Sequence, residues 1–295
     1  MNGLAVTIEG GFPARPGQRF ARYVTRLSET ERAIAERDSG VKHARLVGSA
    51  ACFATLGGSA LLKRLGPGET GVICTCGPWA LAACSGFIDR ANEAGPGLVN
   101  PQQFPSTLVS ATATVTASLL HAHAFAYVVG HDRLAFFEAP HRASSAVKYG
   151  FSAQVLVLAI SSSDSFIEAA RGRAGLRRPS LDASIAFGVA AEGNQATLRL
   201  LGVYIDSSPP AHGGELYEAE WRGDSFACRI DTPLRGGEAY GACGAVLCIA
   251  AAQHHSATAE DPTAAFAVGA RADGRSATAI FQCMGEPGGT PVRPI

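Results

Sequence analysis

The residue types that could carry chemistry gather around one turn in the segment 126–161, AYVVGHDRLAFFEAPHRASSAVKYGFSAQVLVLAIS. Its pattern predicts a strand, a tight turn, a helix and a second strand, which is the arrangement that presents a catalytic nucleophile at the head of a helix. The turn carries His131, Asp132 and Arg133, but no Cys or Ser lies between Ala126 and Ala143. The sequence therefore predicts the scaffold of a nucleophile without the nucleophile.

The remaining cysteines and histidines predict no metal and no cofactor. His121 and His123 form H-x-H, a pair that could hold a metal from one side of a strand, but the sequence offers no third ligand, so we expect core or interface histidines. No glycine-rich loop matches a phosphate-binding fingerprint. The eight cysteines lie in apolar segments without a C-x-x-C pair and are expected to be reduced core thiols; they are Cys52, Cys74, Cys76, Cys84, Cys228, Cys243, Cys248 and Cys283.

Charge and composition narrow the function classes. The 295 residues include 25 basic and 25 acidic side chains, and the formal net charge is zero. No block of Lys and Arg stands out, so we expect neither a nucleic-acid nor an anionic-membrane partner. The N-terminal segment lacks a basic start followed by an apolar run, so we expect no secretory signal and a cytoplasmic protein.

The elements that must position the turn follow an alternating pattern. We expect a strand over 3–10, a helix that starts near Ser28 with a capping box formed with Glu31, and a buried helix over 43–64. A continuously apolar central strand is expected over 71–77, a helix over 79–93, and another helix from about residue 105. Pro140 should kink or end the helix of the turn. Alternating strands and helices predict a layered α/β fold.

The second half of the chain repeats this outline in fewer residues. The ranges 183–192 and 196–206 are interpreted as a hairpin, followed by a glycine-rich turn into a buried helix and a final hairpin that turns at Asp273 and Gly274. We expect two related α/β halves, residues 1–175 and a shortened half at 176–295.

Several segments together resemble the thiolase fold, and within it the β-ketoacyl synthases of fatty-acid and polyketide assembly. NPQQFPSTLVSATATVTASLL (100–120) is similar to the synthase segment in which a proline loop precedes a helix at the dimer interface, and 126–161 is similar to the segment that presents the active-site cysteine. GGEAYGACGAVLCIAAA (236–252) resembles the glycine-histidine motif G-H-x-x-G-A-x-G, and AFAVGARADGRSATAIFQC (265–283) resembles the terminal hairpin. The resemblance implies a thiolase-like fold of two related α-β-α halves.

The departures from the synthase pattern concern its catalytic groups. Counting back from Gly150, the cysteine position falls on Arg133, or on His131 or Asp132 with a shift of a residue or two. Glu238 occupies the histidine position of the glycine-histidine motif. The second histidine motif has no counterpart, and His212 in AHGGE is only its nearest string. A synthase needs a thiolate and two histidines.

This loss of the whole set resembles the chain length factor, an inactive homologue that pairs with a catalytic synthase. The resemblance implies an active ketosynthase as the partner in a heterodimer, or a second copy in a homodimer, and acyl carrier protein as the carrier of a polyketide, polyene or fatty-acid-type chain. The resemblance also places one segment at the subunit interface. Four of its residues are spaced by four and are expected to share one helical face, namely Phe104, Leu108, Thr112 and Thr116. This face either lines a substrate tunnel or packs against the core of the chain itself.

Two alternatives stay open at this point. One is an acyltransferase or hydrolase with rewired chemistry that uses Glu238, His131 or His212, and the other is a homodimeric structural or binding protein. Arg133 lies near a helix start, where a cation is unfavourable, so it calls for a partner. The candidates are Asp132 and Glu138 in a salt bridge that fills the vacant site, or a bound carboxylate such as an acidic acyl group.

Overall fold

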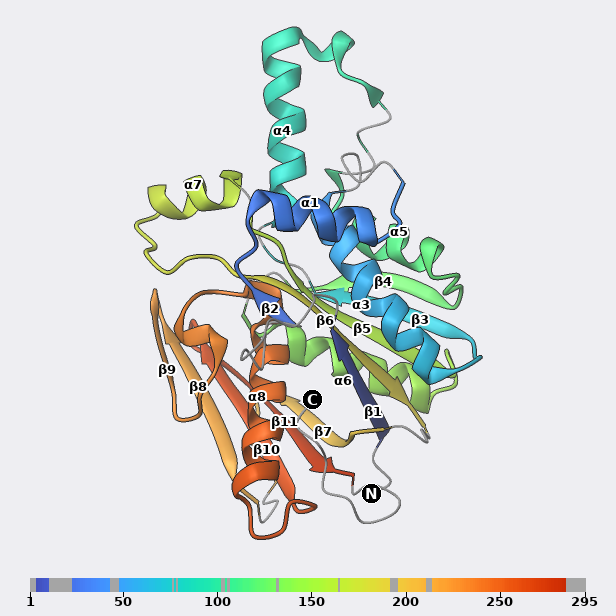
Figure 1. Cartoon of the computed structure of the whole chain (residues 1–295), viewed down its shortest axis with the longest axis vertical. Helices are drawn as coiled ribbons and strands as arrows, with labels where there is room; N and C mark the ends of the chain where they lie inside the picture. Colours follow the sequence, from blue (N-terminus) through green and yellow to red (C-terminus); the bar gives the residue numbers. More distant parts are fainter. Residues whose placement is uncertain are drawn as a thin grey trace.

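The computed structural model describes residues 4–10, 23–42, 48–75, 77, 79–101, 104, 107–130, 133–163, 165–191, 196–210 and 214–284. The described chain is a mixed α/β structure built on one 11-stranded sheet (Figure 1). Its strands are β1 (Leu4–Gly10), β2 (Val24–Thr25), β3 (Thr70–Thr75), β4 (Phe125–Val129), β5 (Gln154–Ser161), β6 (Asp182–Ala190), β7 (Leu198–Ile205), β8 (Leu216–Arg222), β9 (Ser225–Cys228), β10 (Ala265–Ala272) and β11 (Arg275–Cys283).

The sheet runs in the order β4-β3-β5-β6-β1-β7-β11-β10-β8-β9, with β2 paired to β6. β3 pairs in parallel with β4 and β5, and β8 pairs in parallel with β10, whereas the remaining neighbours are antiparallel. β4 and β9 lie at the two ends of the sheet, and β1, the first strand of the chain, joins the two parts between β6 and β7.

Helices cover both faces of the sheet. They are α1 (Glu29–Asp38), α3 (Ser49–Leu65), α4 (Trp79–Ala94), α5 (Ala111–Leu119), α6 (Ala135–Lys148), α7 (Ser165–Arg173) and α8 (Cys243–Thr258), with short 3-10 turns η1 (Pro96–Leu98), η3 (Pro233–Arg235) and η4 (Tyr240–Ala242). α3 and α5 pack on one face, and α6 and α8 pack on the other. Every residue of β5 is buried because helices cover it on both sides.

α6 and α8 approach each other closely at Gly244. A Cβ atom there would lie 2.8 Å from the ring of Phe137 and 2.9 Å from the side chain of Phe136. A side chain at this position would therefore push the two helices apart. The second glycine of the GACG string thus brings the head of α8 against the helix of the nucleophile-like turn.

Most of the predicted elements are confirmed. α1 starts after Ser28 with the predicted capping box, since the Ser28 hydroxyl accepts from the Glu31 N–H and the Glu31 carboxylate accepts from the Ser28 N–H. The predicted strands around the turn, the central strand β3 and the buried helix α8 are present. The last hairpin turns at Asp273 and Gly274, whose φ angles of 52° and 80° suit a tight two-residue turn.

Two sequence predictions about local structure are wrong. β6 and β7 do not form a hairpin, because β1 lies between them. The helix expected from residue 105 begins at Ala111. Pro140 does not end α6, which continues to Lys148, so of the two expected effects only a kink stays a prediction. The stretch 207–233 contains β8 and β9, and His255 is buried within α8.

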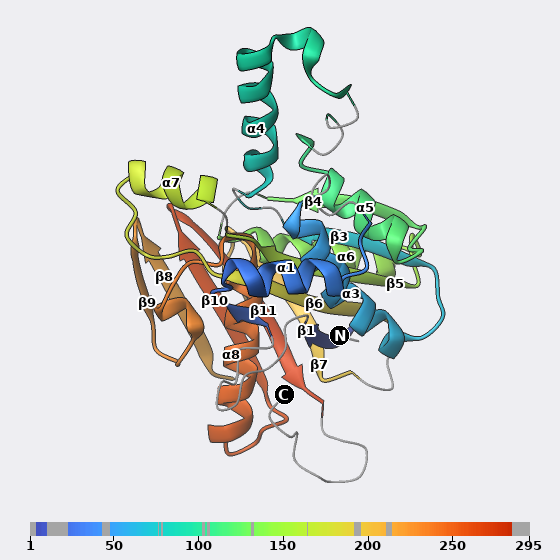
Figure 2. The same cartoon turned by 45° about the horizontal axis from the view of Figure 1, so that its top comes forward.

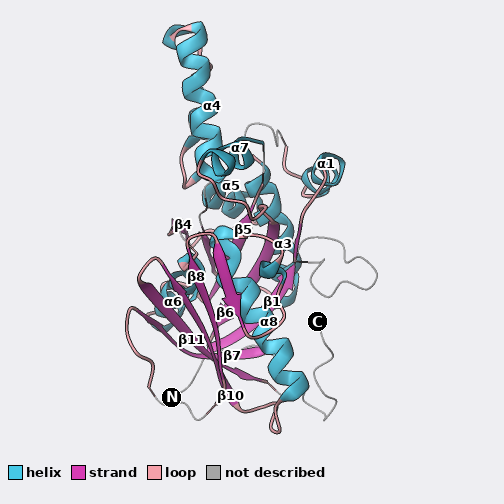
Figure 3. Ribbon diagram, turned by 90° about the vertical axis from the view of Figure 1, so that its left-hand side faces the viewer, coloured by secondary structure: helices cyan, strands magenta, loops and turns pink. Residues whose placement is uncertain are grey.

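α4 stands apart from the rest of the molecule. It projects away from the sheet in all three views (Figures 1, 2 and 3), and packs chiefly against η1 and α7. None of the described helices is long and apolar enough to cross a membrane. The division of the chain at residue 175 stays a prediction.

Candidate functional site

Arg133 and Glu238, the two positions that the resemblance assigns to the nucleophile and a histidine, form an ion pair. Arg133 lies directly before α6, and its Nε is 3.3 Å from Glu238 Oε2. Glu238 is held by its own backbone, because its N–H donates to the Pro179 carbonyl and its carbonyl accepts from the Leu181 N–H. Arg133 therefore has an acidic partner, but this acid is Glu238, which is neither of the two candidates, Asp132 and Glu138, that the sequence analysis named.

The Glu238 carboxylate is fully buried and accepts from three groups. Arg178 Nη1 lies 3.4 Å from Oε2, the oxygen that also meets Arg133, and the Cys243 thiol donates to Oε1 over 3.0 Å. Burial, together with the adjacent Glu238 carboxylate, raises the pKa of Cys243 well above its usual value. Cys243 is therefore a protonated hydrogen-bond donor and not a thiolate.

Two aromatic rings of the β8–β9 hairpin back the two arginines. The Arg133 guanidinium lies 6.0 Å from the centre of the Trp221 ring, and that of Arg178 lies 5.1 Å from the Phe226 ring. The two rings contact each other with centroids 4.9 Å apart. Carboxylate, arginines and rings thus form a closed cycle, in which each guanidinium meets an anion on one side and a π face on the other.

This cluster engages its charged side chains in ion pairs, but its described residues hold no reactive group. Within the described residues it contains neither a thiolate nor an unengaged base, because Glu238 is occupied by two cations and Cys243 is protonated. Sequence reasoning missed Arg178, Cys243 and the two rings. Their only signals were the place of Cys243 within the motif itself, five residues after Glu238, and the basic pair Arg177–Arg178.

The other predicted site residues lie outside the described residues or away from this cluster. His131, Asp132 and His212 lie outside the described residues. Glu138 does not meet Arg133, because it pairs with Arg142 one turn further along α6, at 2.5 Å. The rings of His121 and His123 lie 6.1 Å apart before β4, and the described residues contain no group of three or more potential metal ligands.

The four predicted tunnel residues do not share one helical face. Phe104 and Leu108 precede α5 and are 53% and 49% exposed, whereas Thr112 and Thr116 lie within α5 and are buried. The prediction assumed one helix from about residue 105, but the helix starts at Ala111. α5 packs against α3, β3 and β4, and Thr112 and Thr116 are among its buried residues. A tunnel-lining role accordingly stays a prediction for Phe104 and Leu108 and loses its geometric basis for the two threonines.

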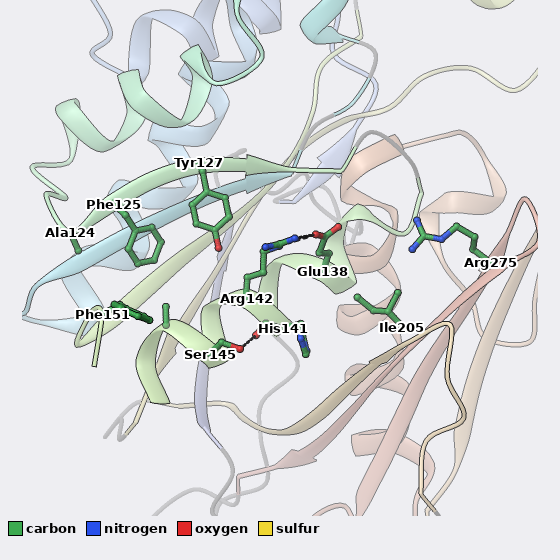
Figure 4. Close-up of a pocket in the computed structure, with 11 residues that line it drawn as sticks. Ala124, Phe125, Tyr127, Glu138, His141, Arg142, Ser145, Phe151, Ile205 and Arg275 are labelled. Atoms are coloured by element: carbon green, nitrogen blue, oxygen red, sulfur yellow. Dashed lines mark hydrogen bonds and ion pairs between the residues drawn. The ribbon is translucent and has the colours of Figure 1, made fainter. Parts of the chain in front are cut away.

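A groove of about 730 Å³ lies beside the edge strand β4 (Figure 4). Its aromatic floor contains Phe125 and Tyr127, whose rings stack at 5.5 Å, and its rim includes the Glu138–Arg142 ion pair. Burial raises the pKa of Tyr127. Sequence reasoning missed the groove because it combines β4, α6, the turn after α6 and the β7 and β11 strands.

Solved structures of ketosynthases share this fold. The ishigamide ketosynthase/chain length factor superposes with a TM-score of 0.68 at 14% identity, over 96% of this chain and 99% of that chain. The type II PKS acyl-carrier protein complex AntDE:AntF, with its ketosynthase bound to the hexaketide, gives 0.67 at 10% identity, over 96% and 100%. The ketosynthase ApeO in complex with its chain length factor ApeC from Xenorhabdus doucetiae gives 0.53 at 12% identity, over 95% and 99%.

No family model and no curated protein matches the sequence. At these identities the similarity establishes the architecture. It covers nearly the whole chain in each comparison. The chain therefore has the thiolase-like α/β fold of ketosynthases and chain length factors.

Proposed function

We propose that this chain is a non-catalytic ketosynthase-like subunit of the chain length factor type, which pairs with an active ketosynthase during chain elongation on acyl carrier protein. The observation that carries the proposal is the Arg133–Glu238 ion pair, at the two positions that the resemblance assigns to catalytic groups. The fold similarity to ketosynthases, which includes a ketosynthase in complex with its chain length factor, supports the same assignment.

The chemistry of condensation explains why this ion pair matters. The synthase reaction needs a thiolate to carry the acyl chain and imidazoles to stabilise the enolate. A guanidinium cannot attack a thioester, and a carboxylate that already meets two arginines cannot replace an imidazole. The scaffold is kept while the charged groups at these positions are engaged with one another in ion pairs, which favours a structural role for this chain beside a catalytic one.

The projecting helix α4 supports the need for a partner. Short helices have marginal stability in water unless they pack against other parts of a protein. α4 packs chiefly on η1 and α7, and Ile88 on α4 and Leu98 after it are exposed. Phe104, in edge-to-face contact with Phe87 of α4, adds to this apolar surface. A second subunit would cover these side chains.

Co-expression tests the proposal. The chain is produced together with a catalytic ketosynthase from the same genome. The complex is sized by chromatography, and elongation on acyl carrier protein is measured with each protein alone and with both. We expect a one-to-one complex and elongation only from the pair. Thioester hydrolysis or acyl transfer by this chain alone, abolished by Glu238→Gln, would favour the rewired enzyme instead.

A further inference from the structure

Two histidines on the turn between α5 and β4 have exposed side chains. His121 and His123 flank Ala122, which is 5% exposed and belongs to the hydrophobic core beneath α5. Because Ala122 is directed into the core, its two neighbours are directed away from it together. Of the two environments expected for this pair, core and interface, the structure excludes the core.

The backbone of this turn is held at both ends. The Ala122 N–H donates to the Ala117 carbonyl of α5 over 2.9 Å, and the Ala124 N–H donates to the carbonyl of Thr70, the first residue of β3, over 3.2 Å. The helix end and the neighbouring strand therefore fix the segment that carries the two imidazoles. Ligands held in place by the fold lose little conformational freedom when they bind an ion.

His121 occupies a position where helices usually have glycine. It follows the C-cap Leu120, its N–H donates to the Ser118 carbonyl over 3.3 Å, and its φ angle is 53°. Glycine is common at this position because the left-handed conformation is unfavourable for residues with a side chain. The chain thus carries an imidazole next to that of His123 at a position where backbone conformation alone favours glycine.

The two imidazole rings are close enough to share one ion. Their centres lie 6.1 Å apart and their planes make an angle of 61°. Metal–nitrogen distances of about 2.0–2.1 Å place two ring centres about 5 Å apart around a tetrahedral ion, so the rings need to approach by about 1 Å. Small rotations about the side-chain torsions of two exposed residues achieve this, and the rings are not stacked, so their edges can turn toward a common point.

The local charge also favours a cation. The C-terminal end of a helix carries a partial negative charge, and His121 directly follows the end of α5. The described residues contain no group of three or more potential metal ligands, so the pair supplies two ligands and water supplies the others. Such a site is open and exchangeable, unlike a closed structural zinc site. Imidazole ligands suit Zn²⁺, Ni²⁺ and Cu²⁺, whereas Mg²⁺ and Ca²⁺ prefer oxygen ligands.

We propose that His121 and His123 form a surface chelate for a divalent transition metal ion, with one nitrogen from each imidazole and water as the ligands. An ion bound there connects the end of α5 to the start of β4. The site lies within one turn of this chain and does not use the Arg133–Glu238 cluster. It is therefore independent of the proposed pairing with a ketosynthase and is tested on the isolated chain.

Calorimetric titration with Zn²⁺ tests the chelate. We expect wild type to bind one Zn²⁺ with a dissociation constant that rises at least about tenfold in His121→Asn and in His123→Asn, because each change removes the second, intramolecular bond. Asparagine tolerates the left-handed conformation, so the turn should persist. His141→Asn, at an exposed histidine of α6, is the matched control and should leave Zn²⁺ binding unchanged. Equal dissociation constants in wild type and the two pair variants, or no saturable binding up to millimolar Zn²⁺, would overturn the proposal.

Chemical modification of the wild-type chain gives a second test that needs no substitution. Histidines are carbethoxylated with diethyl pyrocarbonate, and the modified residues are located by mass spectrometry. At a Zn²⁺ concentration about ten times the dissociation constant, we expect the modification of His121 and His123 to slow about tenfold, because the ion occupies their nitrogens. The exposed His141 and His254 should react as fast as without Zn²⁺. Unchanged reaction of the pair, or equal slowing of all four histidines, would refute a site at this turn.

Discussion

Substitution of Glu238 by Gln is the most direct test of the buried charge cluster. Glutamine keeps the shape of the side chain but removes the charge that holds Arg133 and Arg178, both of which are 14% exposed. Removal of one partner from a buried ion pair typically costs 3–5 kcal/mol, and the residual solvent access of the guanidinium groups places the expected loss at about 3 kcal/mol. Arg133→Met leaves the Arg178 contact in place and should cost about 1–2 kcal/mol.

The assay is equilibrium unfolding in urea, with the double variant completing a thermodynamic cycle. Because Arg133 and Glu238 are in contact, we expect a coupling energy of about 1–2 kcal/mol between the two substitutions. Glu220→Gln is the control, since its ion pair with Arg222 lies on the surface and its loss should leave the urea midpoint unchanged. Additive effects of Arg133→Met and Glu238→Gln, or a wild-type midpoint for Glu238→Gln, would refute the cluster as described.

Four further predictions follow from individual contacts. Thr116→Val should raise the free energy of unfolding in urea by about 1 kcal/mol, because the buried Thr116 hydroxyl meets no hydrogen-bond partner in the described structure. The length of the product made with the ketosynthase should not change, and a destabilised variant would show that the hydroxyl is hydrogen-bonded. Phe104→Ala should change the length of the product made with the ketosynthase while altering the thermal midpoint little, and an unchanged product would remove Phe104 from the tunnel. Burial raises the pKa of the Cys243 and Cys248 thiols well above the usual value. After treatment with an alkylating reagent at about pH 8, peptide mapping should find Cys84 labelled and these two thiols unlabelled until urea is added. Rapid labelling of Cys243 would contradict its burial. The Ser276 N–H and the Arg275 guanidinium lower the pKa of the Asp206 carboxyl below 3.8. The ionised carboxylate therefore contributes its full stabilisation of the folded chain above that pH, and this stabilisation is lost as the pH falls through the folded-state pKa. The urea midpoints of wild type and Asp206→Asn should differ near neutral pH and converge in acid.

Local patterns predicted the individual elements because those elements are set by nearby residues. The Ser28–Glu31 capping box, the apolar run of β5 and the Asp273–Gly274 turn are each formed by residues a few positions apart. The sequence pattern misplaced the start of α5. The residues before Ala111 mix apolar and hydroxyl side chains much as the helix itself does, so the pattern did not mark where the helix begins. It also gave no warning that Pro140 is tolerated within α6.

The sequence by itself determined that the turn before the helix of 126–161 lacks Cys and Ser, that the chain is layered α/β, and that its segments resembling synthase motifs carry Arg133 and Glu238 in place of the cysteine and a histidine. Only the tertiary structure decided that β1 separates β6 from β7, that Arg133 meets Glu238 across 105 positions, and that a groove lies at the β4 edge. Side-chain periodicity records whether a face is buried, but it does not record which distant segment covers that face. Pairing between distant segments depends on the packing of the whole chain, and for that reason the ion pair that argues against catalysis became visible only in the folded molecule.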